Sequence, residues 1–446
     1  MEGKSSTHSI PACHKKPKKK KNNSVSVCLT NCHYDLVSTT AEIFGYPKVE
    51  EDDDWNLYWT DMFVVFDKYK KMKRYQKINH FPGMSELCRK DLLARNLNRM
   101  SKLFPKDYKF FPKTWCLPFD YSDAILYSTN HKNCSFILKP DRGSRGKGIE
   151  IIRSLKNISP IVRKICQVYV NRPYLVNGYK FDLRVYVLVT SCDPLRIYIY
   201  NEGLVRFASN VYKTPKGRNV KNTFMHLTNY SVNKYSETNG QIKQTLAWLN
   251  DLLTAQNHNV DALWNKIDDA IIKTIISVQP VLKHLYITCF PDHDLFPACS
   301  ELLGIDIILD HKLKPQILEV NHSPSFNIET LADFDVKENL IYDMFAMMNL
   351  DCCDKMKIIL QDRKRITDRL TSGKSFKHRR KITGKTFQEY FDMEYKWRGD
   401  FRLIYPLPEN QKLYQKFFNQ SQNGTSAKLT NKHLHKKRNK SKFDKE

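Results

Sequence analysis

The sequence predicts a mixed α+β protein that ends in a basic helical extension. Strand-like runs surround a glycine-rich turn at residues 135–152 and recur at residues 185–201. Residues 243–287 place apolar side chains mostly at helical spacing, and the strand-like runs ELLGIDIILD and QILEVN follow them. Beyond Asp351 the chain becomes strongly basic, which sets this last part apart from the predicted core.

The composition is that of a globular protein with a large positive charge. The chain has 446 residues, of which 41% are hydrophobic, so a wholly disordered protein is excluded. Its 73 Lys and Arg against 47 Asp and Glu give a net charge of +26, which attracts polyanions. Nucleic acid, an anionic membrane and acidic protein tails are all possible partners on charge alone. No apolar run is long enough for a secretory signal or a membrane span, so we expect a soluble, intracellular protein with reduced thiols.

The N-terminal part divides into a polar tail and a globular region. Residues 1–24 are polar and rich in Lys, so we expect a disordered basic tail. From Ser24 the run SVSVCLTN predicts a short strand, and WNLYWTD alternates as an edge strand does. The stretch 84–103 spaces its apolar residues as an amphipathic helix does.

The segment FILKPDRGSRGKGIEII has the residue types of a phosphate-covering loop. Gly143, Gly146 and Gly148 lie between two strand-like runs, where backbone amides can close on a phosphate. It is neither a P-loop nor a dinucleotide fingerprint, because Lys139 precedes all three glycines and a strand follows them. Taken alone, a simple hairpin turn explains the three glycines about as well.

The run GYKFDLRVYVLV alternates charged and apolar residues along a predicted strand. Lys180, Asp182 and Arg184 therefore point to one face of the sheet, and Phe181 and Leu183 point to the other. A solvated strand face explains such a row equally well without further context.

The strand pair near residue 310 predicts a metal site. Asp306 lies on the first strand, and Glu319 and Asn321 are two residues apart on the second, so these two share a sheet face. Carboxylate and amide oxygens on adjacent strands are the hard ligands that suit Mg²⁺. The alternative is that Glu319 and Asn321 face outward by chance.

Five ordered motifs carry a family resemblance. KPDRGSRGKGI, KFDLRVYVL, HLTNYSVNK, GIDIILD and LEVNHSPSF together resemble the tubulin tyrosine ligase-like family, from about Ser26 to Asp351. The runs QKINHFPGMSELCRKDLLARNLNRM and SCDPLRIYIYNEGLVRFA are most similar to its polyglutamylase branch. The resemblance implies an ATP-grasp fold with N-terminal, central and C-terminal lobes.

The resemblance also implies roles for the matching positions. The residues expected at the ATP site are Lys139, Arg145, Gly146, Gln167, Val168, Tyr169, Val170, Lys180, Phe181, Asp182, Thr228 and Asn229. Those expected to hold the incoming glutamate are Arg206, Tyr230 and Lys243, and those expected to hold Mg²⁺ are Asp306, Glu319 and Asn321. Lys180 and Arg184 are the expected catalytic residues: the lysines and Mg²⁺ would offset phosphate charge, and Arg184 would stabilise the tetrahedral oxyanion.

The implied activity is ATP-dependent tubulin polyglutamylation, with free L-glutamate joined to glutamate side chains of the tubulin tails. We expect a disordered tail at 1–24, a catalytic domain at 25–351, a basic microtubule-binding region at 352–405 and a disordered tail at 406–446. Residues 355–385 hold twelve Lys and Arg against two Asp, a local net charge of +10. We expect a monomer in the cytoplasm, on the cytoskeleton and at the cilium or basal body, with neither nucleic acid nor membrane as partner.

Other activities remain open at this point. A tubulin glycylase, another ATP-grasp ligase, or a microtubule-binding protein with impaired catalysis would share most of these features. Gln316, Ser300 and Lys147 depart from the branch pattern, in which Trp, Phe and Arg are usual. The first two remove apolar bulk near the metal strands, but the expected metal ligands themselves are present.

Overall fold

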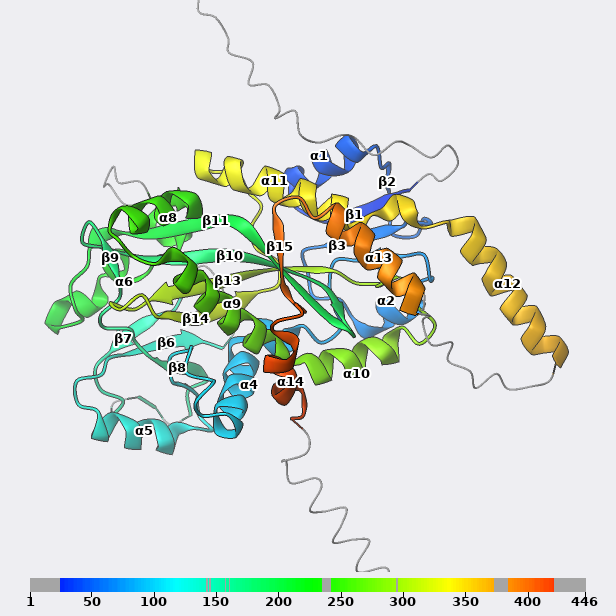
Figure 1. The fold of residues 1–446 in the computed structure, drawn as a ribbon. Coiled ribbons are helices and arrows are strands. Elements are labelled where there is room, and N and C mark those ends of the chain that lie inside the picture. Colours follow the sequence, from blue (N-terminus) through cyan, green and yellow to red (C-terminus); the bar gives the residue numbers. More distant parts are fainter. Residues whose placement is uncertain are drawn as a thin grey trace, which may run out of the picture.

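The computed structural model of the chain describes residues 25–141, 143, 146–156, 158–159, 161–234, 242–293, 296–372 and 384–420. The described residues form three β-sheets with helices packed around them (Figure 1). The mixed α+β class is thus confirmed, and the assignment of the three sheets to ATP-grasp lobes stays a prediction. Among the described helices, none is both long enough and apolar enough to cross a lipid bilayer.

The first sheet is parallel, with strand order β2-β1-β3-β4. Its strands are β1 (Val27–Asn31), β2 (Lys48–Val49), β3 (Leu57–Thr60) and β4 (Lys77–Ile78), and its helices are α1 (Asp35–Phe44), α2 (Phe66–Lys71), α3 (Ser85–Cys88) and α4 (Lys90–Leu103). The expectation of an edge strand at WNLYWTD was wrong, because β3 lies between β1 and β4 and all four of its residues are buried. The helix expected at 84–103 is divided, since Arg89 is extended and separates α3 from α4.

The second sheet carries the glycine-rich turn. Its antiparallel order is β5-β8-β6-β7, and the helices α5 (Tyr121–Asn130) and α4 pack against it. Its strands are β5 (Thr114–Cys116), β6 (Phe136–Pro140), β7 (Glu150–Ile152) and β8 (Lys164–Val168). Trp115, Phe136 and Leu138 form a small core under it. The strands β6 and β7, which flank this turn, lie next to the central sheet (Figure 1).

The third, central sheet has seven strands and positions most of the polar residues of interest. Its main order is β12-β11-β10-β13-β14, with β9 on β10 and β15 on β11. The strands are β9 (Leu175–Val176), β10 (Tyr179–Cys192), β11 (Leu195–Val211), β12 (Lys243–Thr245), β13 (Glu301–Leu309), β14 (Pro315–Asn321) and β15 (Phe401–Tyr405). The associated helices are η1 (Gly217–Lys221), α6 (Thr223–His226), α7 (Tyr230–Asn233), α8 (Leu246–Ala255), α9 (Val260–Ile276), α10 (Gln279–Cys289), α11 (Leu331–Met348) and η2 (Leu350–Cys352).

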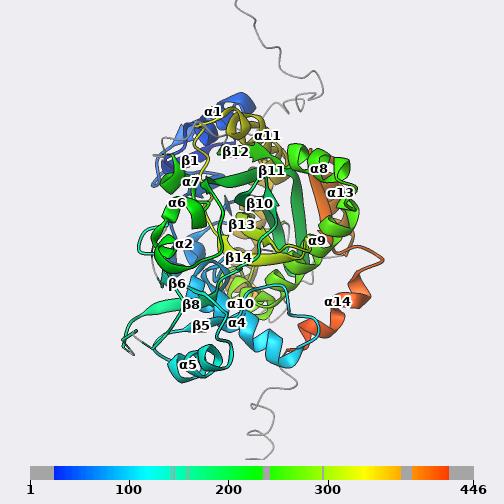
Figure 2. The ribbon, with the colours of Figure 1, turned by 90° about the vertical axis from the view of Figure 1, so that its left-hand side faces the viewer.

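The central sheet is covered on both faces. Val185 and Val187 of β10 lie in a core shared with α9 and α10, whereas Tyr186 and Leu188 lie in a second core shared with α1 and α11. The side view places α11 and α1 on the opposite side of the sheet from α9 (Figure 2). Because strand residues alternate between faces, one strand supplies both cores.

The C-terminal part is folded further than the composition predicts. It consists of α12 (Lys355–Ser372), α13 (Gly384–Lys396), β15 and α14 (Gln411–Phe418). The disordered tail expected from residue 406 was placed too early, because α14 buries Tyr414 and Phe417 in the main core. The basic region expected at 352–405 is likewise not separate from the core, since β15 pairs with β11. Residues 1–24 and 421–446 lie outside the described residues.

Candidate active site

One face of β10 is a row of charged side chains. Lys180, Asp182 and Arg184 alternate along the strand as expected, and Lys180 and Asp182 are buried rather than solvated. Phe181 points the other way and packs 5.5 Å from the ring of Phe207. Any contact of Phe181 with a nucleotide must therefore come from its backbone.

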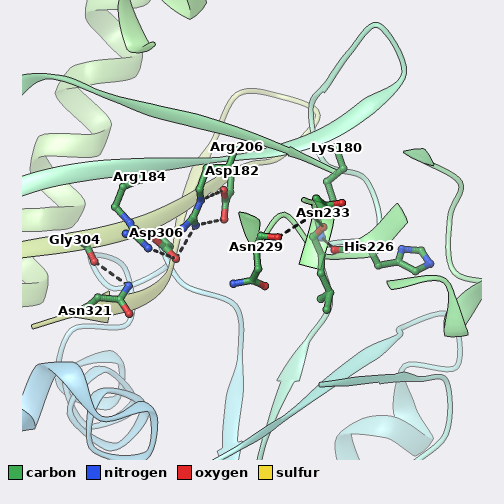
Figure 3. A network of polar contacts seen from close by, with 11 residues as sticks. Lys180, Asp182, Arg184, Arg206, His226, Asn229, Asn233, Gly304, Asp306 and Asn321 are labelled. Atoms are coloured by element: carbon green, nitrogen blue, oxygen red, sulfur yellow. Dashed lines mark hydrogen bonds and ion pairs between the residues drawn. The ribbon is translucent and has the colours of Figure 1, made fainter. Parts of the chain in front are cut away.

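Two arginines and two aspartates form a buried ion network at the centre of the site (Figure 3). The Nε and terminal nitrogen of Arg206 donate to both oxygens of Asp182, at 2.8 and 2.6 Å. Arg206 also approaches Asp306 at 2.7 Å, and Arg184 Nε donates to the other oxygen of Asp306 at 2.6 Å. Burial raises the pKa of Asp306, but the two guanidinium groups outweigh it and hold the pKa well below its ordinary value. The network therefore favours the ionised form of Asp306 even though this carboxylate is buried.

The expected metal ligands lie together. Asp306 is the direct strand partner of Glu319, and Asn321 is the partner of Gly304, two residues before Asp306. Asn321 Nδ2 donates to the Gly304 carbonyl at 3.1 Å, which leaves its Oδ1 available as an acceptor. The described residues contain no group of three or more His, Cys, Asp and Glu side chains arranged for a metal, so the set is two carboxylates and one amide. Oxygen donors of this kind fit Mg²⁺, although Asp306 would share its charge with two arginines.

Lys90 is a cation at this site that the sequence did not reveal. It is the first residue of α4, and its ammonium lies 3.8 Å from Glu319 Oε2. The same ammonium donates to the carbonyl of Gly143 in the glycine turn, at 3.0 Å. Lys90 thus joins the metal strand to the turn, and nothing in its local sequence signals this contact.

Two buried lysines lie on strands of different sheets, Lys139 on β6 and Lys180 on β10. Lys139 Nζ on β6 donates to Gln167 Oε1 at 3.0 Å, and burial lowers the pKa of Lys139. Lys180 Nζ donates to the carbonyl of His226 at 2.6 Å and to the hydroxyl of Tyr169 at 3.0 Å. Burial lowers the pKa of Lys180 to about 7, with Asp182 opposing the shift and Lys139 adding to it. A phosphate bound beside these two amines would favour their charged forms, which burial disfavours in the free protein.

A chain of hydrogen bonds fixes Lys180. The Tyr169 hydroxyl contacts His226 Nδ1 at 3.1 Å, and His226 Nε2 contacts the Asn219 carbonyl at 3.1 Å. Burial and the nearby Lys180 lower the pKa of His226 to about 4, so the ring is neutral. Nε2 must then carry the proton, and Nδ1 accepts from Tyr169, whose oxygen accepts from Lys180.

The glycine turn approaches the segment after α6. Gly146 has φ +75°, and a Cβ at that position would lie 2.9 Å from Val232 and 3.2 Å from Asn229 Oδ1. Asn233 holds this segment by donating to the Leu227 and Asn229 carbonyls at 2.8 and 3.0 Å (Figure 3). Thr228 is buried beside Asn229, whereas Arg145 lies outside the described residues.

A cavity of about 670 Å³ lies beside His226, whose carbonyl accepts from Lys180. It is lined by Ile149 and Ile151 of the β6–β7 region, by residues of η1, and by His226 and Leu227. Tyr169 packs with Ile149, Ile151 and Leu227. The expected linker segment Gln167–Val170 therefore contributes one aromatic side chain beside the wall of this cavity, and Gln167 turns instead to Lys139.

The residues expected to hold an amino acid meet at the edge of the sheet. Lys243 on β12 is the strand partner of Arg206, and its ammonium lies 3.7 Å from the centre of the Tyr230 ring. Lys243 is paired with Asp333 of α11 at 2.6 Å. Sequence reasoning missed Asp333 as a residue of the site, although the run Thr330 to Asp333 has the spacing of a helix-capping box, which α11 forms.

A sequence profile of the Tubulin-tyrosine ligase family matches residues 68–358, which is more than half of the chain. The chain belongs to this family. It is 49% identical over 404 residues to human "Tubulin polyglutamylase TTLL6", with 87% of this chain and 45% of the relative covered. Human "Tubulin polyglutamylase TTLL13" is 47% identical over 416 residues, covering 91% and 51%, and a Tetrahymena thermophila "Probable beta-tubulin polyglutamylase" is 42% identical over 377 residues, covering 81% and 32%. The chain spans about half the length, or less, of these curated relatives.

Two departures from the family's polyglutamylase pattern leave the charged site intact. Gln316 is half-buried on β14, opposite Ile308. Ser300 precedes β13, and its buried hydroxyl has no hydrogen-bond partner among the described residues. In this tubulin-tyrosine ligase family chain, Asp306, Glu319 and Asn321 nevertheless keep their facing positions.

Proposed function

We propose that the chain is an ATP-dependent ligase that adds glutamate to glutamate side chains of tubulin tails. The observation that carries the proposal is the facing pair Asp306 and Glu319 with its cations. Arg184 of β10 and Arg206 of β11 lie 2.6 and 2.7 Å from Asp306, and Lys90 of α4 lies 3.8 Å from Glu319. Such a site suits neutralisation and alignment of a nucleotide triphosphate. The choice of glutamate and tubulin rests on the relatives, several of which are named tubulin polyglutamylases.

ATP has a consistent place in the site. The cavity beside Tyr169 has room and apolar walls for the adenosine. Lys180, which donates to the carbonyl of the lining residue His226, would contact the phosphates together with Lys139. The glycine turn, fixed by Lys90, would cover the phosphates with backbone amides. Asp306, Glu319 and Asn321 would hold Mg²⁺, which supplies charge neutralisation to the phosphate oxygens when bound.

The reaction transfers a phosphoryl group and then displaces it. An oxygen of the acceptor carboxylate attacks the γ-phosphorus, the bond to the β–γ bridging oxygen breaks, and ADP leaves. The amine of free L-glutamate then attacks the resulting acylphosphate, loses a proton and expels inorganic phosphate, which leaves an amide. Arg184 is the candidate to stabilise the tetrahedral oxyanion, and it must then divide its hydrogen bonds between that oxygen and Asp306.

The substrate surface is proposed on charge. The helix α12 projects from the body and carries exposed basic residues (Figure 1). It begins the segment of net charge +10, which complements the acidic tubulin tails and a cytoskeletal location. Electrostatic docking should weaken steeply as salt is added. A small-metabolite ligase would have little use for this segment.

The test is ligation on assembled microtubules. The chain is incubated with microtubules, ATP, Mg²⁺ and labelled glutamate, glycine or tyrosine, beside a Glu319→Gln control. We expect glutamate label on tubulin that depends on ATP and is lost in the control. Glycine or tyrosine labelling would contradict the amino-acid assignment, and unchanged labelling by Glu319→Gln would contradict the site.

A further inference from the structure

The start of α11 adds two buried charges to the edge of the active site. Asp333 and Lys337 are one helical turn apart, and their side chains are 0% and 4% exposed. The ammonium of Lys337 lies 2.7 Å from Asp333 Oδ1 and donates to the Asn327 carbonyl at 2.7 Å. These contacts tie α11 to the loop that leads from β14.

Asp333 holds Lys243 from a fixed position. Its Oδ2 accepts from Lys243 at 2.6 Å, and also from the backbone and hydroxyl of Thr330, at 3.1 and 2.9 Å. Lys337 completes the clamp on the other oxygen. Lys243 therefore has little freedom, because its carboxylate partner is itself anchored by a helix N-terminus and a second lysine.

Glu329 is a second, weaker partner of Lys243. Its carboxylate lies 3.6 Å from the Lys243 ammonium, and its side chain is 37% exposed. A lysine ammonium has three donors, so Asp333 leaves donors free in the direction of Glu329. An exposed carboxylate at this distance can leave at small cost.

The buried charges do not balance without Glu329. In the cluster around Lys243, the two buried lysines Lys243 and Lys337 share one buried carboxylate, that of Asp333. Burial lowers the pKa of Lys337, and Lys243 and Arg184 add to this effect while Asp333 opposes it. One positive charge therefore lacks a buried partner, and a carboxylate that replaced Glu329 would keep the balance.

We propose that a carboxylate of the incoming amino acid binds Lys243 in place of Glu329, and that Asp333 and Lys337 are positioning residues for it. This inference rests on the proposed function and on the expectation, implied by the family resemblance, that Lys243 holds the incoming glutamate. Glu329 is then a placeholder that the substrate displaces. Removing the carboxylate of Glu329 should therefore strengthen the binding of glutamate, whereas removing the positioning residue Lys337 should weaken it.

Calorimetric titration of L-glutamate tests the inference. The full chain is used with Mg²⁺ and a non-hydrolysable ATP analogue. Glu329→Gln should bind glutamate about threefold tighter or more, because a competing carboxylate is gone. Lys337→Met should bind about tenfold weaker or more, and Lys337→Arg should recover part of the loss.

Lys273→Met is the matched control. Lys273 is also a buried lysine paired with an Asp four residues earlier, Asp269 at 2.7 Å, but it lies on α9 in the main core. It should lower the melting temperature as Lys337→Met does and leave glutamate affinity unchanged.

The outcomes separate this inference from the proposed function. Three results would overturn the inference. They are a glutamate affinity of Lys337→Met within twofold of the wild type, weaker binding of glutamate by Glu329→Gln, and no binding of glutamate by the wild type. If Lys337→Met does not fold, the direction of the Glu329→Gln change decides. A chain that binds glutamate with the expected changes, yet labels no tubulin, would overturn the proposed function alone.

Discussion

Binding of ATP should draw a proton onto Lys180. In the free protein burial lowers the pKa of this lysine from an ordinary 10.5 to about 7. At pH 8 only about a tenth of the molecules then carry the charge. A phosphate beside the amine would restore a high pKa, so binding at pH 8 should take up about 0.9 proton, and binding at pH 6 about 0.1.

The same pKa shift makes folding stability depend on pH, and the direction follows from the number of protons that the folded and unfolded chains bind. Between pH 7 and 10.5 the unfolded chain binds more protons at this site than the folded chain, so stability should rise with pH across that window. Across that window, this lowering of the pKa of Lys180 corresponds to a change of about 5 kcal/mol in the free energy of unfolding. Lys180→Met should therefore be more stable than the wild type below pH 7.

The assay is calorimetry of ATP·Mg²⁺ binding in buffers of different ionisation enthalpy. The slope of the observed enthalpy against buffer enthalpy gives the protons taken up. Lys180→Met serves as the control, with weaker binding and no uptake from this site. Equal slopes for the wild type at pH 6 and pH 8 would refute the reasoning, because they would mean that Lys180 is already charged in the free protein.

Three further changes test other parts of the structure. Lys90→Met should weaken ATP binding about tenfold while ADP binding changes little, because Lys90 lies where the metal strand meets the phosphate turn. Lys102→Met, at the exposed far end of α4, should change the affinity for neither nucleotide. An equal loss of affinity for ATP and ADP in Lys90→Met would contradict this placement. Gly146→Ala should reduce ligation rate about tenfold or more with little loss of melting temperature, since the φ is positive and a Cβ would meet Val232; wild-type rates would show that the turn need not approach that segment. Phe417→Ala should lower the free energy of unfolding by about 3 kcal/mol or more in denaturant titrations. Leu413→Ala, at an exposed position of α14, should change it by less than about 0.5 kcal/mol. Similar values for the two variants would mean that α14 is not packed on the core.

Strand periodicity explains why part of the site was predictable. The alternation of Lys180, Asp182 and Arg184 fixes their common face whatever the rest of the fold does. The same rule places Glu319 and Asn321 together, and β13 brings Asp306 opposite them as expected. Their roles as metal ligands stay predictions.

Contacts between distant segments were not predictable. Lys90 reaches Glu319 from a helix more than 200 residues earlier, and Asp333 reaches Lys243 from a helix on the other side of the sheet edge. The pairing of Arg206 with Asp182 and Asp306 depends on strand order, which a single sequence does not reveal. For α14, a polar composition concealed two aromatic anchors, Tyr414 and Phe417, whose burial outweighs it.

The helix α12 is connected to the folded protein on both sides and is not a free C-terminal tail. Near its start Ile358 is buried and Asp362 is paired with Arg74 at 2.6 Å, while the chain after it returns through α13 and adds β15 to the central sheet. If a microtubule binds α12 as proposed, it would hold the protein at two places, through Arg74 and through β15 of the central sheet. Because β15 pairs with β11, which carries Arg206, binding of this helix would also orient the strands of the candidate site.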